Sequence, residues 1–100
     1  MGFRQMKKNP LESTEIEANQ ETELGNPWQV VLFNDEVHSI DEVVFQIQKA
    51  TGFALERAFE LTMRVHNNGK AVIYIGTEEK CERVAGVLAL IRLIVQVEKT

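Results

Sequence analysis

The chain has 100 residues, enough for one domain and too few for two. Its net charge of −4 disfavours nucleic acid as a partner, because phosphate binding needs clustered Lys and Arg, and here the basic residues are scattered among more numerous acids. No apolar run approaches the roughly 20 residues that span a bilayer, and the first residues lack the apolar core of a signal peptide. The single cysteine, Cys81, excludes an intrachain disulfide and fits a reducing compartment, so we expect a cytoplasmic protein that binds neither nucleic acid nor membrane.

The first 26 residues differ in composition from the rest of the chain. They are polar and rich in Glu, with few aromatic or β-branched side chains. Such a segment cannot bury enough apolar surface to offset the entropy lost on ordering. We therefore predict a disordered N-terminal arm over residues 1–26 and a folded core over residues 27–100.

The core begins with a strand and a helix. The run WQVVLF at residues 28–33 is β-branched and aromatic, as is typical of a buried strand, and it ends in the acidic cluster NDE at 34–36. Apolar side chains then recur at helical spacing over residues 40–51. Ser39, with Glu42 three residues later, matches a capping box. The acidic cluster therefore directly precedes the start of a helix.

Two further helices and two further strands follow. A second helix is predicted from residue 55, and Asn-Asn-Gly at 67–69 ends it, since these residues tolerate the left-handed conformation found at helix ends. AVIYIG at 71–76 is a second strand, Thr77 caps a third helix, and LIVQVEK at 93–99 is a third strand. The predicted apolar face of the second helix consists of Leu55, Ala58, Phe59, Leu61, Thr62, Val65 and His66.

The order strand, helix, helix, strand, helix, strand predicts the fold class. It indicates an α+β two-layer sandwich, with a three-stranded antiparallel sheet and three helices on one face. No Gly or Pro separates the third helix from the last strand, so the break falls anywhere from Leu88 to Leu93. A folded part of this size holds one modest core and no deep cleft.

The polar residues match no catalytic motif. The sequence has no Gly-rich phosphate loop, no HExxH, no CxxC and no GxSxG, and Cys81 lies on an apolar helix face where an inert thiol is expected. Asp35, Glu36, His38 and His66 could gather a metal only at a spacing that fits no familiar ligand set, so we expect no metal or other cofactor. A general acid/base pair of Glu36 and His66 stays open as an alternative.

The same residues suit a binding site. Asn34, Asp35 and Glu36 are adjacent hydrogen-bond acceptors where the strand ends, and His66 lies just before a chain reversal. Apolar helix residues expected near the same corner are Ile40, Thr62 and Val65. Acceptors around a small apolar hollow suit a cation joined directly to an apolar group, such as a free α-amino group beside a large hydrophobic side chain. The other interpretation is an ordinary solvated turn with a structural histidine.

Two long stretches of the sequence resemble a known family. QVVLFNDEVHSIDEVV, followed by ALERAFELTMRVHNNGKAVIYIGT, resembles the ClpS family, the adaptor of the bacterial and plastid Clp protease in the N-end rule pathway. The family pattern is a hydrophobic strand ending in Asn-Asp-Asp or a close variant, a helix, and then ERA…VHxxGKA, which residues 34–36, 56–58 and 65–71 match. The resemblance covers about residues 28–80 well and the last strand loosely. It implies the fold of ClpS and of the C-terminal domain of the bacterial ribosomal stalk protein.

The resemblance implies which residues bind substrate. In the family, the Asn and the last acid of the strand-end motif, with the His, bind the α-amino group of an N-terminal Leu, Phe, Tyr or Trp. The matching positions here are Asn34, Glu36 and His66, with Asp35 at the rim. The family's apolar pocket corresponds to Ile40, Thr62, Val65 and Leu93.

The resemblance also implies the function. We expect a non-enzymatic, monomeric adaptor that binds proteins with bulky hydrophobic N-terminal residues (N-degrons) and delivers them to the Clp unfoldase–protease. Its partner would be the N-terminal domain of a ClpA- or ClpC-type AAA+ unfoldase, with Glu79 and Arg83 as candidate contacts. Residues 1–26 would serve in handing over the substrate. The alternatives are a protein-interaction module of the ribosomal stalk type and a small hydrolase.

Three positions depart from the family pattern. Glu36 replaces the commoner Asp, and Thr62 stands where a larger apolar residue, often Met, is usual. Residues 39–41 read Ser-Ile-Asp in place of Pro-Met-Glu, and the third helix looks shorter than usual. The first two changes alter the pocket, so the preference among Leu, Phe, Tyr and Trp does not follow from the resemblance.

Overall fold

The computed structural model describes residues 26–100, and the predicted arm lies outside them except for its last residue, Asn26. The elements in chain order are β1 (Trp28–Phe33), α2 (Ile40–Thr51), α3 (Leu55–Asn68), β2 (Lys70–Gly76), α4 (Glu78–Ala89) and β3 (Ile94–Lys99). This is the predicted order. The break between the last helix and the last strand falls at residues 90–93, within the predicted interval.

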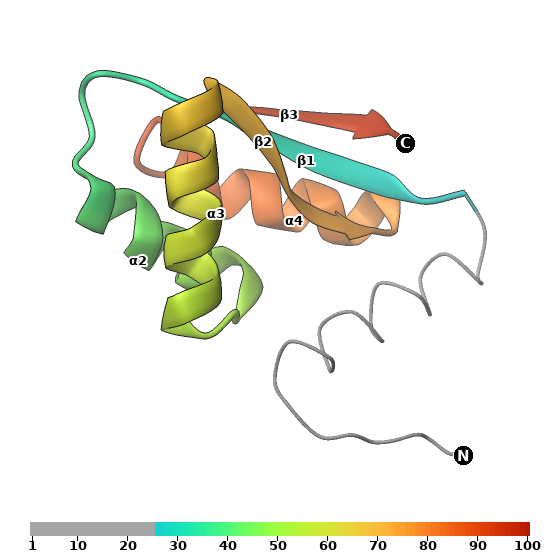
Figure 1. Cartoon of the computed structure of the whole chain (residues 1–100). Coiled ribbons are helices and arrows are strands. Elements are labelled where there is room, and N and C mark those ends of the chain that lie inside the picture. Colours follow the sequence, from blue (N-terminus) through green and yellow to red (C-terminus); the bar gives the residue numbers. More distant parts are fainter. Residues whose placement is uncertain (1–25) are drawn as a thin grey trace, which may run out of the picture.

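The three strands form one antiparallel sheet in the order β2-β1-β3, and the helices cover one of its faces (Figure 1). α4 packs against all three strands, α3 contacts β2, and α2 lies against α3 and α4. The predicted two-layer α+β sandwich is thereby confirmed. None of the helices in the described part of the chain has the length and apolar character needed to cross a membrane.

The register of the sheet decides which segments meet at the end of β1. Phe33, the last residue of this central strand, pairs with Lys70 at the start of β2 and with Ile94 at the start of β3. The chain leaving β1 therefore emerges between the end of α3, which directly precedes β2, and the turn that precedes β3. Segments from the beginning, the middle and the end of the core meet at this one edge.

The core lies between the sheet and the helices. Its buried apolar residues are Val30, Leu32, Val44, Ile47, Ala58, Leu61, Val65, Ile73, Cys81, Val84, Ala85, Leu88 and Leu93. The alternation of Val30 and Leu32 on the inner face of β1 is the period of two that a strand imposes.

The predicted apolar face of α3 is wrong at Leu55, Phe59 and His66. The side chains of Leu55 and Phe59 are about half exposed, at 55% and 50%, and His66 is exposed as well. The buried face of this helix is instead centred on Ala58, Leu61 and Val65, which repeat at three- and four-residue spacing. Leu55 and Phe59 lie on its flank, since each residue turns the helix by about 100°.

Candidate functional site

A backbone hydrogen bond joins the end of β1 to the end of α3. The amide of Asn34 donates to the carbonyl of Gly69 at 2.9 Å, and the amide of Gly69 donates to the carbonyl of Val65 at 2.8 Å. Gly69 has a φ of 89°, a left-handed conformation in which glycine ends a helix without steric strain. The last turn of α3, which carries His66, is thereby fixed beside Asn34.

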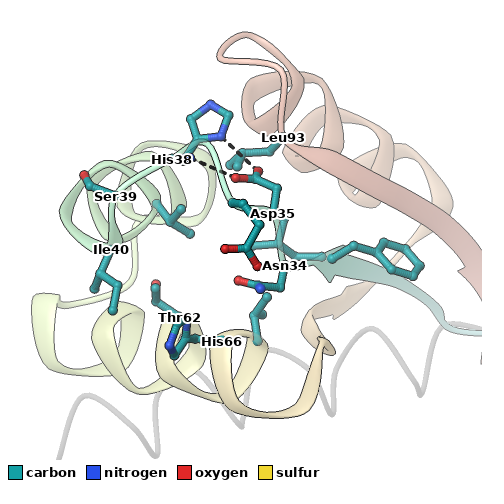
Figure 2. A pocket seen from close by; sticks show the side chains of 13 residues that line it. Asn34, Asp35, His38, Ser39, Ile40, Thr62, His66 and Leu93 are labelled. Carbon is teal, nitrogen blue, oxygen red and sulfur yellow. Dashed lines mark hydrogen bonds and ion pairs between the residues drawn. The ribbon is translucent and has the colours of Figure 1, made fainter.

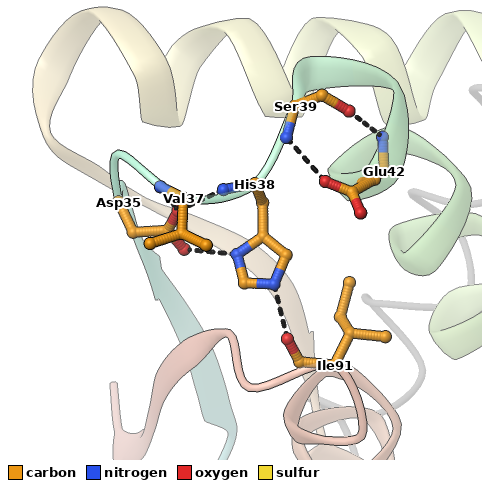
Figure 3. A network of polar contacts seen from close by, with 6 residues as sticks. All are labelled: Asp35, Val37, His38, Ser39, Glu42 and Ile91. Atoms are coloured by element: carbon orange, nitrogen blue, oxygen red, sulfur yellow. Dashed lines mark hydrogen bonds and ion pairs between the residues drawn. The ribbon is translucent and has the colours of Figure 1, made fainter.

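The loop between β1 and α2 is organised by Asp35. One oxygen of its carboxylate, Oδ1, accepts hydrogen bonds from the amides of Val37 and His38, both at 2.8 Å. The other oxygen, Oδ2, accepts one from Nδ1 of the His38 ring at 2.9 Å, as Figure 3 shows. An Asp that binds amides two and three residues ahead stabilises a tight turn. Asp35 therefore shapes the loop, and its carboxylate binds these three groups of the loop itself.

The ring of His38 also reaches a distant part of the chain. Its Nε2 lies 2.5 Å from the carbonyl oxygen of Ile91, in the turn between α4 and β3 (Figure 3). We call these two ring contacts, to Asp35 and to Ile91, the His38 bridge. The bridge joins the loop after β1 to the turn that precedes Leu93.

The pKa values of the two bridge residues move in opposite directions. Desolvation raises the pKa of Asp35, but the hydrogen bonds from the His38 amide, the His38 ring and the Val37 amide together lower it below the ordinary value. The hydrogen bonds of His38 to Asp35 and to the Ile91 carbonyl raise its pKa, and desolvation opposes them only in part. Both shifts favour a carboxylate paired with an imidazolium.

The predicted capping box sets the start of α2. The Ser39 hydroxyl accepts a hydrogen bond from the Glu42 amide at 3.1 Å, and the Glu42 carboxylate accepts one from the Ser39 amide at 2.8 Å. The first turn also holds Asp41, so acids offset the positive end of the helix dipole at this site. The cap begins the helix at Ile40, and both Ile40 and Val43 line the pocket described next.

These segments enclose a pocket of about 250 Å³ at the end of β1. Figure 2 shows the side chains that surround it, with Thr62 and His66 from α3 on one side and His38 and Leu93 on another. The residues that line it are Leu32, Phe33, Asn34, Asp35, Glu36, His38, Ser39, Ile40, Val43, Thr62, Val65, His66 and Leu93. All eight residues that the sequence assigns to a binding site are among them.

Sequence reasoning missed five of the lining residues. Four of them were expected only as strand, cap or helix residues: Leu32, Phe33, Ser39 and Val43. Their closeness in the chain to Asn34 or Ile40 is the signal that could have identified them. His38 was considered only as a metal ligand. Nothing in the sequence places it opposite Ile91, because that contact spans 53 residues.

The polar side chains of the pocket differ in what they already bind. Within the described part of the chain, the side chains of Asn34, Glu36 and His66 form no hydrogen bond, whereas Asp35 and His38 are bound to each other. Glu36 and His66 are exposed, so a ligand can reach them. The site thus offers an amide, a carboxylate and an imidazole on the rim of an apolar hollow.

Thr62 adds no free polar group to this pocket. Its side chain is 3% exposed, and its hydroxyl donates to the Ala58 carbonyl one turn earlier at 2.8 Å. A threonine that bonds back to its own helix satisfies its polar atom internally. Thr62 therefore acts in the wall as a short side chain.

The other residues that the sequence analysis considered lie outside this pocket or form no further site. Glu79 and Arg83 are exposed on α4 and do not line the pocket. Cys81 is fully buried in the core. Among residues 26–100, no group of three or more His, Cys, Asp or Glu side chains is placed to hold a metal ion.

Comparison with known proteins identifies relatives of the chain. The family described as "ATP-dependent Clp protease adaptor protein ClpS" matches residues 23–90. A protein of that name from Rhodococcus opacus is 37% identical over 73 residues, which cover 73% of this chain and 63% of the relative. One from Corynebacterium glutamicum is 35% identical over 75 residues, covering 73% and 75%. The chain thus spans less than two thirds of the first of these relatives.

A solved structure supports the fold independently. Agrobacterium tumefaciens ClpS2, determined bound to L-phenylalaninamide, superimposes with a TM-score of 0.70 over 75% of this chain and 98% of that one, at 17% identity. Its likeness concerns the fold, and the sequence relatives establish the kinship. The chain belongs to the ClpS family of ATP-dependent Clp protease adaptor proteins.

Proposed function

We propose that this chain is a non-enzymatic adaptor that binds the free N-terminus of proteins beginning with a bulky hydrophobic residue. It then delivers these proteins to the Clp unfoldase–protease through the N-terminal domain of a ClpA- or ClpC-type unfoldase. Asn34, Glu36 and His66 bind the α-amino group, and Ile40, Thr62, Val65 and Leu93 surround the first side chain.

One observation carries the proposal. Three polar side chains without a hydrogen-bond partner in the described structure, those of Asn34, Glu36 and His66, line the same 250 Å³ pocket as buried apolar residues. A ligand that fits both must join a hydrogen-bond donor directly to an apolar group. The first residue of a protein with a free amine is such a ligand.

The electrostatics of the pocket favour a cation. The carboxylate of Glu36, which pairs with no other described residue, lines it, and so does the last turn of α3, the negative end of that helix dipole. The opposite end of a helix dipole, at the start of α2, is neutralised by its capping box and acidic first turn. An acetylated N-terminus carries no charge and has fewer donors, so the site should reject it.

The energies suffice for reversible binding. Hydrogen bonds to a charged amine contribute about 1.5–3 kcal/mol each, and burial of a large apolar side chain adds roughly 1.5–3 kcal/mol. After ordering costs, these terms are consistent with micromolar affinity, about −8 kcal/mol. Such affinity allows substrate to be captured and then released to a second protein.

The ligand of the solved relative has the chemistry that this pocket requires. L-phenylalaninamide, bound by the A. tumefaciens protein, joins a free α-amine to a benzyl group. We infer that the first residue of a substrate occupies the corresponding place in this chain.

Peptides that differ only at the first residue test the binding. Fluorescence anisotropy should give micromolar affinity for peptides beginning with Leu, Phe, Tyr or Trp, and much weaker binding for Gly and for acetyl-Leu. Equal affinity for Leu and acetyl-Leu peptides would count decisively against the proposal. Chromatography of the same mixtures should show intact peptide, and its turnover would indicate a hydrolase instead.

Delivery needs a second assay. A fluorescent protein beginning with Leu should be degraded faster by a Clp unfoldase–protease when the chain is added, and the same protein beginning with Gly should not. The exposed pair Glu79 and Arg83 on α4 is our candidate for the unfoldase contact. The double variant E79A/R83A should keep its peptide affinity but lose the acceleration.

A further inference from the structure

We propose that His38 is a positioning residue of the pocket, whose protonated ring holds the loop carrying Asn34 and Glu36 against the turn carrying Leu93, so that peptide affinity falls when this ring loses its proton. The proposal rests on the function proposed above and deepens it by adding a regulation by pH. Its basis is the geometry of the His38 bridge.

The bridge requires two protons on one ring. Nδ1 faces a carboxylate oxygen of Asp35 at 2.9 Å, and Nε2 faces the carbonyl oxygen of Ile91 at 2.5 Å. Neither oxygen carries a proton to donate, because a backbone carbonyl only accepts, and the two amide hydrogen bonds to the other carboxylate oxygen, Oδ1, favour the ionised form of Asp35. A neutral imidazole has a single N–H and can satisfy only one of them. Both contacts coexist only in the imidazolium.

The nearby charges favour that form. On the same loop the ring contacts Asp35, and from α2 the charge of Glu42 acts on it. The turn between α4 and β3 provides the Ile91 carbonyl, and the only charged residue of that turn, Arg92, is exposed. The ring is 12% exposed, so water competes little for its two N–H groups.

The proton on Nε2 leaves first when the ring titrates. Nδ1–H is held by a charged acceptor, and charge-assisted hydrogen bonds are stronger than those to a neutral carbonyl. Deprotonation therefore leaves the Asp35 contact in place and turns a lone pair of Nε2 toward the Ile91 oxygen. The contact between the loop and the turn changes from attraction to repulsion.

This change reaches the pocket from two sides. The loop residues Asn34 and Glu36 and the turn residue Leu93 all line the same cavity, and Figure 2 shows Asn34 and Leu93 beside it. Asp35 keeps its hydrogen bonds to the Val37 and His38 amides, so the conformation of the loop itself is retained. Only its hydrogen bond to Ile91, in the segment between α4 and β3, is lost. The fraction of molecules with an assembled pocket then falls, and apparent affinity falls by the same fraction.

Two substitutions of His38 each preserve one of the two ring contacts of the bridge. Asn in place of His38 brings an amide near the position of Nδ1 but leaves Ile91 without a donor. Gln extends further and brings its amide near the position of Nε2. Neither titrates, so each fixes one state of the contact. All other groups of the chain and of the peptide are common to all variants, so the differences between variants isolate His38.

The test is the affinity of a Leu-initiated peptide for the full chain from about pH 5.5 to about pH 8.5. At the lower pH, wild type should bind roughly two- to tenfold more tightly than His38→Asn, the effect of one hydrogen bond of ordinary strength. The gap should close as pH rises. His38→Gln should keep most of the affinity and bind at least as tightly as wild type at the upper pH. A gap that is the same at every pH would overturn the proposal.

NMR of the wild-type chain without peptide tests the bridge separately. The His38 ring should titrate above the ordinary value of about 6.5, and the Leu93 methyl signals should shift with the same midpoint. A midpoint at or below the ordinary value, or Leu93 signals that ignore it, would overturn the bridge even if peptide binds. If the ring behaves as expected but no variant binds the peptide at any pH, the proposed function is wrong, and the affinity effect with it.

Discussion

Asn34, Glu36 and His66 differ in chemical character, so their substitutions should separate the contributions to the proposed amine binding. Asn34 offers a neutral carbonyl, Glu36 a carboxylate and His66 a ring nitrogen. Only Glu36 brings a full charge that no other residue of the described chain pairs. It also differs from the Asp common in the family by one methylene, which extends its reach.

We expect Glu36→Gln to weaken binding of a Leu-initiated peptide about tenfold, because a neutral acceptor replaces a charged one opposite the ammonium group. Anisotropy titration measures the change. Glu36→Asp is the matched control: it keeps the charge and should bind within a few-fold of wild type. Wild-type affinity in Glu36→Gln would mean that the amine lies elsewhere in the pocket.

In the proposed function, Thr62 should control the length available to the first side chain of the substrate. Because its hydroxyl is already bound to Ala58, the residue contributes only a short wall. The longer side chain of Thr62→Met should extend into the cavity and weaken the binding of Trp-initiated peptides roughly tenfold more than that of Leu-initiated peptides. This is the usual size of discrimination between side chains by the dimensions of a pocket. Thr62→Val, which changes the polar atom but not the length, should leave the ratio of the two affinities unchanged. An equal loss for both peptides in Thr62→Met would exclude a role in selection.

At the scale of elements, the cap of α2 positions one wall of the pocket. Ser39→Ala removes one side of the capping box and should lower the free energy of unfolding by about 1 kcal/mol, measured by urea denaturation. Since Ser39 and Ile40 both line the pocket, peptide affinity should fall as well.

Thr77→Ala provides the control for this prediction. Thr77 caps α4 with the same kind of bond, accepting from the Lys80 amide at 3.2 Å, but does not line the pocket. Thr77→Ala should lower the free energy of unfolding by a similar amount and leave the peptide affinity unchanged. If both variants lose binding alike, general destabilisation is the cause.

The His38 bridge also makes the stability of the fold depend on pH. His38 has a raised pKa, so its contribution is complete below the unfolded value of about 6.5 and is lost as pH rises through the folded one. Asp35 has a lowered pKa, so its contribution is present above about 3.9 and is lost as pH falls through the folded one. The urea midpoint of wild type should exceed that of His38→Asn most near about pH 5.5. A constant difference at acid, neutral and alkaline pH would contradict this.

Local patterns predicted the elements because each depends on neighbours in the chain. The capping box of Ser39 and Glu42 and the left-handed Gly69 are readable from a few residues. The rotation of α3, which exposes Phe59, depends on where β2 and α2 lie and is not readable locally. The same holds for the contact of His38 with Ile91, whose partner is set by the turn after α4.

At the scale of the whole molecule, the pocket is a product of sheet topology. β1 is central, so its end is flanked by β2 on one side and β3 on the other. α4 beneath all three strands fixes their relative positions, with Leu88 fully buried among them. The eight residues assigned to the site from the sequence could be named by resemblance, but only the register of both strand pairs explains why Leu93 lies beside Asn34.

Because every lining residue in the described part of the chain falls within residues 32–93, we expect the pocket to function without the first 25 residues. A chain of residues 26–100 should bind a Leu-initiated peptide within about twofold of the full chain, because it keeps all of the described hydrogen bonds and walls of the site. If the predicted arm hands over substrate, the same truncation should abolish accelerated degradation by the Clp protease. Loss of peptide affinity would show that the first 25 residues complete the site.

The bond from the Asn34 amide to the Gly69 carbonyl has a practical consequence for such experiments. It is made by main-chain atoms, so exchanging the side chain at position 34 or 66 leaves the scaffold that spaces the two positions intact. Alanine variants at these sites should therefore report missing functional groups and not a displaced backbone. Crystals of such variants soaked with amino-acid amides offer a direct way to see what each group contributes.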